Sequence, residues 1–140
     1  MMEKMNITIN LYDYTAKTIS QIASETKDGV LLHELADIDQ EIIQVAVAKN
    51  KVTYATTLYK LLKTKNVSVI IAVIENPKCN DEMLIEILNI CTGENAFMEE
   101  MQVQILLEYL LCLSNQKKKD MGEELKKELL SLCKKYNVED

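Results

Sequence analysis

The sequence predicts an all-α protein, a short right-handed α-solenoid of about three helix-pair repeats closed by two longer C-terminal helices. A block of 26 residues recurs, so that residues 45–50 (VAVAKN) align with residues 71–76 (IAVIEN). Self-similarity with a period of about 20 to 50 residues is typical of stacked-repeat architectures. Apolar residues spaced i, i+3 and i+4 recur in the second half of each block, as on one face of a helix. Three Gly and one Pro in 140 residues leave little material for a turn-rich β fold.

The 26-residue period divides the central part of the chain into three repeats, residues 13–38, 39–64 and 65–90. Each repeat is predicted to form two short helices. The first helix carries a dense apolar run, residues 42–48 in the middle repeat, which is too apolar for a helix with one solvated face. We therefore expect it to be sandwiched between neighbouring repeats. The β-branched residues of this run would also suit a strand, but its alanines are poor strand residues.

The second helix of each repeat carries an apolar stripe. In the middle and last repeats the stripe consists of Leu58, Leu61 and Leu62, then Leu84, Ile87 and Leu88. Asn80, followed by two acidic residues, is predicted to cap the start of the last of these helices, where the helix dipole favours negative charge. Asp28 and Thr53 are predicted to cap the corresponding helices of the first and middle repeats.

Two residues are predicted to mark the ends of the first helices. Pro77 disfavours the helical conformation at Asn76, so the helix before it should end there. Asn50 tolerates the left-handed conformation that terminates many helices.

The flanking segments do not follow the period. Before the repeats, Ile7, Ile9 and Leu11 alternate with polar residues and suggest a brief extended segment. After a loop at 92–95, a long helix is predicted over 96–113. Its apolar positions are Phe97, Met101, Ile105, Leu106, Tyr109 and Cys112.

A polar connection at 114–119 leads to the last helix, for which Asp120 and Glu123 have the spacing of a capping box. Its stripe consists of Met121, Leu125, Leu129, Leu132, Cys133 and Tyr136. Residues 91–140 are thus predicted to cap the repeats at 13–90, within a single domain spanning 1–140.

The composition argues against several classes of partner and site. A net charge of −6 disfavours nucleic acid and anionic membranes, because both bind mainly Lys and Arg. The longest apolar run, residues 69–74, is too short for a membrane span, and the N-terminus leads into no apolar stretch of signal-peptide length, so we expect a cytoplasmic protein.

The four cysteines show no C-x-x-C pair, and the chain has one histidine, His33. We therefore expect no metal site and no cofactor, and we expect free, buried thiols in a reducing compartment. His33 has no Ser or Cys partner at a recognisable spacing, so no catalytic site is predicted.

Residues 39–88 resemble the HEAT-like α-solenoids of the leucine-rich repeat variant type. One copy of that pattern fits residues 45–50 with Thr53, Leu58 and Leu61, and the next fits residues 71–77 with Leu84 and Ile87. Lys51 and Cys79 stand where Pro and Thr are usual. With the degenerate first copy, the resemblance covers roughly residues 13–90. It implies a solenoid fold and says little about function.

The period also places side chains of the second helices in columns. The three columns are Glu34, Lys60 and Glu86; Asp37, Lys63 and Asn89; and His33, Tyr59 and Ile85. The charged columns fit either an ion-pair ladder on a solvated face or a docking surface of mixed charge. The third column fits either an interface or residues half-covered by the next repeat. The candidate partner-binding residues are His33, Glu34, Tyr59, Lys60, Lys63, Ile85 and Glu86.

Because stacked repeats present an extended surface, we expect a non-enzymatic module that binds a protein or peptide. One alternative is an immunity-type inhibitor of a basic protein, which would use the acidic charge. Another is weak nucleic-acid binding through the basic C-terminal helices, where residues 117–119, 126–127 and 134–135 are lysines. The sequence does not indicate an oligomeric state.

Overall fold

A computed structural model describes residues 15–93 and 98–139, and in this part of the chain eight α-helices and no strand are present. The all-α prediction is confirmed at this level. The extended segment predicted around Ile7, Ile9 and Leu11 lies outside the described residues, as do Asp13 and Phe97. None of the described helices is long and apolar enough to cross a membrane.

The chain divides into two compact units, Met1–Asn76 and Pro77–Asp140, which we call the N-terminal and C-terminal units. The helices of the N-terminal unit are α2 (Ala16–Glu25), α3 (Gly29–Leu35), α4 (Glu41–Lys49), α5 (Ala55–Leu62) and α6 (Val67–Glu75). Those of the C-terminal unit are α7 (Asp81–Thr92), α8 (Glu100–Asn115) and α9 (Glu123–Lys135).

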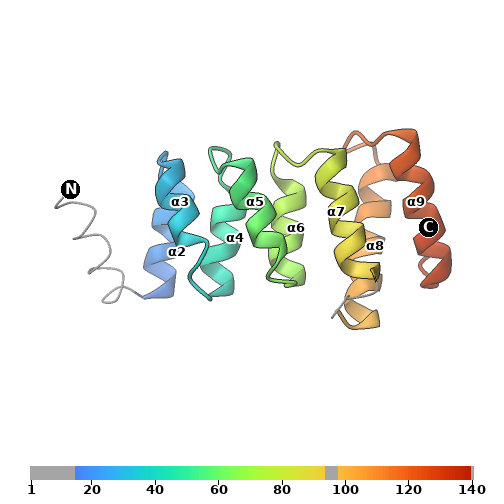
Figure 1. The fold of residues 1–140 in the computed structure, drawn as a ribbon, viewed down its shortest axis with the longest axis horizontal. Coiled ribbons are helices and arrows are strands. Elements are labelled where there is room, and N and C mark those ends of the chain that lie inside the picture. Colours follow the sequence, from blue (N-terminus) through green and yellow to red (C-terminus); the bar gives the residue numbers. More distant parts are fainter. Residues whose placement is uncertain (1–14, 94–97, 140) are drawn as a thin grey trace. The chain divides into compact units, whose positions relative to one another are not determined.

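The helix bounds follow the period seen in the sequence. Both ends of α6 lie one full period after the corresponding ends of α4. The starts of α3, α5 and α7 are likewise separated by one period each. Within the N-terminal unit, α4 packs against α2 on one side and α6 on the other (Figure 1).

The core of the N-terminal unit is aliphatic. Leu58 and Leu61 on α5 are fully buried, and so are Leu32 and Leu35 on α3. The predicted stripe of the second helices is therefore confirmed: spacing of three and four residues keeps one face of a helix turned inward.

Two of the predicted caps form. The carboxylate of Asp28 accepts hydrogen bonds from the backbone N–H groups of Val30 and Leu31, at 3.0 and 3.2 Å. The side chain of Asn80 accepts one from the N–H of Met83 at 3.0 Å. These bonds satisfy N–H groups that have no partner inside the helix.

The cap predicted at Thr53 is wrong. Tyr54 is the residue that precedes α5, and the hydroxyl of Thr53 instead donates a buried hydrogen bond of 2.6 Å to the carbonyl of Val47. Thr53 thus closes the end of α4 instead of opening α5. The carbonyl of Val47 lies in the last turn of α4, where carbonyls lack the helical donor four residues on, and the buried hydroxyl supplies a hydrogen bond there.

Asn50 does not adopt the left-handed conformation that the sequence suggested. Its φ and ψ of −70° and 122° are extended. Asn76 is extended as well, as predicted from Pro77, with φ and ψ of −70° and 134°. The described non-glycine residues with positive φ are Lys65, Lys117 and Asn137.

The two asparagines that follow α4 and α6 have a different role, because their buried carboxamides bond backward to the preceding repeat. The Nδ2 of Asn50 donates to the carbonyls of Ala23 and Thr26, both at 2.8 Å. The Nδ2 of Asn76 donates to the carbonyls of Ala48 and Asn50, at 2.7 and 3.0 Å. Each amide uses both of its protons on carbonyls at the end of the previous first helix.

In the C-terminal unit, α9 packs against α7 and α8. The predicted stripe of α9 is confirmed, except that Tyr136 is only half-buried. The predicted capping box of Asp120 and Glu123 is wrong: α9 begins at Glu123, after Gly122.

The predicted inner face of α8 is wrong in part. Met101 is 70% exposed and Ile105 is 46% exposed. The buried residues are Val103, Leu106, Leu107, Leu110 and Leu111. The residues chosen from the sequence are mostly four apart, and each step of four turns about 40° past a full turn of the helix, so the set moves off the buried face. Alternating steps of three and four residues stay on one face.

We expect Asn76→Ala to lower the free energy of unfolding by about 2 kcal/mol or more, because two carbonyls would lose their donor in the interior. Urea denaturation followed by circular dichroism measures the change. Asn89→Ala is the matched control, since Asn89 is exposed on α7 and its loss should change stability by less than about 0.5 kcal/mol. Equal effects of the two substitutions would contradict a structural role for the Asn76 amide.

Candidate functional site

The second helices of the N-terminal unit bring two of the predicted site residues together. The Nζ of Lys60 on α5 donates to the carbonyl of His33 on α3 at 3.1 Å. The same ammonium pairs with the carboxylate of Asp37 at 2.7 Å. The cation therefore bridges two repeats, but its carboxylate partner is Asp37, three residues beyond the Glu34 that the column predicted.

The imidazole of His33 is also engaged. Its Nδ1 lies 2.7 Å from the hydroxyl of Thr57, and Thr57 has no exposed surface. A substrate cannot reach this hydroxyl without displacing the core around it. The pair links α3 to α5 and has the character of an inter-repeat contact.

The remaining predicted residues are exposed or half-buried. Glu34 and Lys63 are exposed and Tyr59 is half-buried. Ile85 and Glu86 lie on α7 in the C-terminal unit, where both are exposed.

A groove that the sequence did not predict lies between the first helices α4 and α6 of the N-terminal unit. It has a volume of about 530 Å³. Its lining residues are Glu41, Ile42, Val45 and Lys49 from α4, and Ser68, Ile71, Ala72 and Glu75 from α6. Ile42 is 49% exposed, although these helices were expected to be sandwiched all round. One signal was present: the period pairs Ile42 with Ser68, whose small side chain leaves room beside it.

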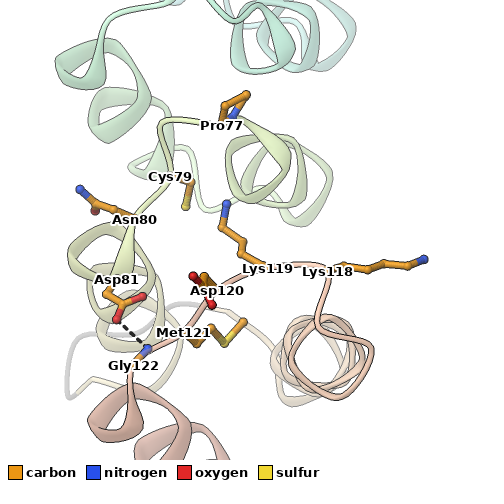
Figure 2. Close-up of a pocket in the computed structure, with 9 residues that line it drawn as sticks. All are labelled: Pro77, Cys79, Asn80, Asp81, Lys118, Lys119, Asp120, Met121 and Gly122. Atoms are coloured by element: carbon orange, nitrogen blue, oxygen red, sulfur yellow. Dashed lines mark hydrogen bonds between the residues drawn. The ribbon is translucent and has the colours of Figure 1, made fainter.

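A second cleft, of about 720 Å³, lies within the C-terminal unit, between the start of α7 and the connection from α8 to α9 (Figure 2). The backbone N–H of Gly122 donates to the carboxylate of Asp81 at 2.8 Å and joins the two segments. Figure 2 shows the side chains of Cys79 and Lys119 turned toward the same part of this cleft, whereas Lys118 points away. Asp81, Asp120 and the two lysines give the lining a mixed charge.

The thiol in this cleft is a poor nucleophile. Burial raises the pKa of Cys79 from its usual 9.0 to about 11, with a lowering contribution from the charge of Lys119 and a raising one from Asp81. Since the thiolate is the reactive form, roughly one molecule in ten thousand would carry it at pH 7. Burial likewise raises the pKa of Cys91 to about 12 and raises that of Cys133.

All four cysteines are free thiols. Cys79, Cys91 and Cys133 are buried, as expected, but Cys112 is exposed, so the prediction of burial is wrong there. Cys112 belongs to the face of α8 that the sequence assigned to the core.

No group of three or more His, Cys, Asp or Glu side chains that could hold a metal ion occurs among residues 15–93 and 98–139. No family model, curated protein or solved structure matches this chain. The charge, burial and shape of its own side chains are therefore the ground for assigning a function.

We expect iodoacetamide at pH 8 to alkylate Cys112 at least tenfold faster than Cys79 in the folded protein, because Cys79 is both buried and protonated. Digestion and mass spectrometry after timed quenching give the rate at each thiol. The rate at Cys79 should rise with pH up to about 11, as the thiolate forms. Equal rates at pH 8 would show that Cys79 is an accessible thiolate and would favour a chemical role for the cleft.

Proposed function

We propose that this chain is a non-enzymatic adaptor or regulatory module of the cytoplasm that binds a protein or peptide. We further propose that 1–140 is a single domain whose scaffold is a right-handed α-solenoid of the HEAT-like, leucine-rich repeat variant type. The register of the helix bounds supports the scaffold, because α6 repeats α4 one period later and with the same length. Free thiols support a reducing compartment.

The open groove between α4 and α6 is the observation that carries the binding role. Its apolar part is formed by Ile42, Val45 and Ile71, and about half of the Ile42 side chain is exposed to solvent. A concave apolar surface with a few charged groups at its rim is the usual form of a binding site. A partner that covered it would remove this apolar area from water.

Two groups could act as a nucleophile or a base, the thiol of Cys79 and the imidazole of His33, and the surroundings of both support a non-enzymatic role. The Cys79 thiol is protonated at neutral pH, because burial raises its pKa to about 11. The ring of His33 is hydrogen-bonded to a hydroxyl that solvent does not reach. A protonated thiol and an imidazole paired with a buried hydroxyl are poorly suited to covalent or acid–base catalysis on a substrate from solvent.

The residues chosen from the sequence remain proposed contact residues, in two groups, one in each unit. They are His33, Glu34, Tyr59, Lys60 and Lys63 in the N-terminal unit, with Ile85 and Glu86 in the C-terminal unit. Lys60 contributes least to this proposal, since its charge is held by Asp37. The exposed charges of Glu34 and Lys63 are better placed for a partner.

We expect a tagged chain to retain a protein partner from lysate of the native host, and the purified partner to bind directly with a micromolar or lower Kd by calorimetry. Ile42→Gln should weaken this binding about five- to tenfold, because it removes a half-exposed apolar contact from the groove. Val30→Gln is the matched control on α3, since Val30 is similarly exposed at 53% but lies outside the groove. The absence of direct binding, together with specific turnover of a small molecule, would contradict the proposal.

An inhibitor of a basic protein is the second candidate, and the net charge of −6 favours it. Charge complementarity mainly accelerates association, and salt screens it. We expect an association rate that falls at least tenfold between low salt and 0.5 M NaCl if this candidate is right, measured by stopped-flow fluorescence with the captured partner. An association rate independent of salt would leave the apolar groove as the dominant contact.

Weak nucleic-acid binding is the third candidate, and it predicts an affinity for DNA or RNA that disappears when Lys117, Lys118 and Lys119 are neutralised.

A further inference from the structure

We propose that the groove between α4 and α6 receives a short helical segment of a partner protein, with aliphatic side chains along its centre and a Lys or Arg beside Glu41. This inference rests on the proposed binding function and specifies the chemistry of the partner. Three features of the groove carry it: its length, its apolar centre and the different charge of its two ends.

The length follows from the helices that form the walls. On α4 the lining runs from Glu41 to Lys49, which at 1.5 Å per residue is about 12 Å. That length matches about two turns of a helix. A segment of this size can place two apolar side chains, one turn apart, on the floor of the groove.

The centre of the groove is apolar and uneven in depth. Ile42 and Val45 form the α4 side, and Ile71 rises from α6. Ser68 and Ala72 on α6 are small, so they leave room for side chains of the incoming segment. A bulky aliphatic residue set between these walls makes the ridge-into-groove contact by which helices pack.

The two ends of the groove carry different charge. At one end, the Nζ of Lys49 lies 3.9 Å from the carboxylate of Glu75, so each charge there has an opposite neighbour. At the other end, the carboxylate of Glu41 accepts a hydrogen bond of 3.0 Å from the amide of Asn66. That amide is neutral, so it orients the carboxylate without neutralising its charge.

A cation on the partner is therefore best placed beside Glu41. The whole chain has a net charge of −6, which also attracts a positively charged segment, over a longer distance. An acidic segment would meet repulsion from both.

Three labelled synthetic peptides of twelve residues test this inference. The first carries two leucines one helical turn apart and a lysine at one end. The second replaces the lysine with glutamate, and the third replaces the leucines with serines. Binding is measured by fluorescence polarisation, and the contact surface is mapped from amide chemical shifts of the labelled protein.

We expect the lysine peptide to bind about two- to fivefold more tightly than the glutamate peptide, as one partly exposed ion pair allows. The serine peptide should bind at least tenfold more weakly than the lysine peptide. Glu41→Gln should remove the preference for lysine, whereas Glu25→Gln, an exposed carboxylate of α2 outside the groove, should keep it. The amide shifts should concentrate on α4 and α6.

Shifts confined to α3 and α5, no binding at millimolar peptide, or a lysine preference that survives Glu41→Gln would each overturn the inference. If the captured partner still binds the chain directly in those cases, the proposed function stands and only this choice of groove and chemistry fails. If the peptides bind as expected but no partner is captured, the chemistry of the groove stands and the adaptor role fails.

Discussion

Two buried carboxamides, those of Asn50 and Asn76, join the ends of the first helices in the N-terminal unit. The last carbonyls of a helix have no intrahelical donor, and they must find one when the helix end is buried. One Asn side chain supplies two donors to the preceding repeat, as the bonds from Asn76 to Ala48 and Asn50 show. Asp has no such donors, so the residue type is required by the chemistry of the contact. A shift of one residue between neighbouring helices would leave these carbonyls unpaired, and the bonds therefore fix the register of α2, α4 and α6.

That register determines which side chains meet on the surface. Because α4 and α6 are aligned one period apart, Ile42 and the small Ser68 hold equivalent positions and line the same groove, and Lys49 lies beside Glu75. The groove is a consequence of this pairing of large with small residues. The second helices are joined differently, through Lys60 with Asp37 and through His33 with Thr57. These contacts occupy the side chains of Lys60 and His33, two of the residues that the sequence offered for a partner.

The sequence predicted the features that depend on periodicity within a helix and missed those that depend on contacts between helices. The starts of α3 and α7, with their caps at Asp28 and Asn80, and the buried leucines all follow from local patterns. The alignment of Asn50 with Asn76 was visible, but the carbonyls they bind belong to other helices, and no local rule identifies them. Thr53 was assigned to the wrong helix for the same reason. The inner face of α8 was misassigned because the chosen residues advance in steps of four, which leave the buried face. The exposure of Ile42 was missed because it depends on the small Ser68 of another helix, which no pattern within α4 identifies.

Hydrogen exchange of the side-chain amides is the most direct measurement of whether these carboxamides hold the repeats together. Both Nδ2 protons of Asn50 and of Asn76 are directed at backbone carbonyls, and of these four bonds only the one from Asn50 to Thr26 is part-exposed. They should exchange at least a hundredfold more slowly than the side-chain amide of the exposed Asn89, as followed by NMR after transfer to D₂O. Exchange of the Asn76 amide at the rate of Asn89 would show that the bond between repeats does not exist in solution and would contradict the account.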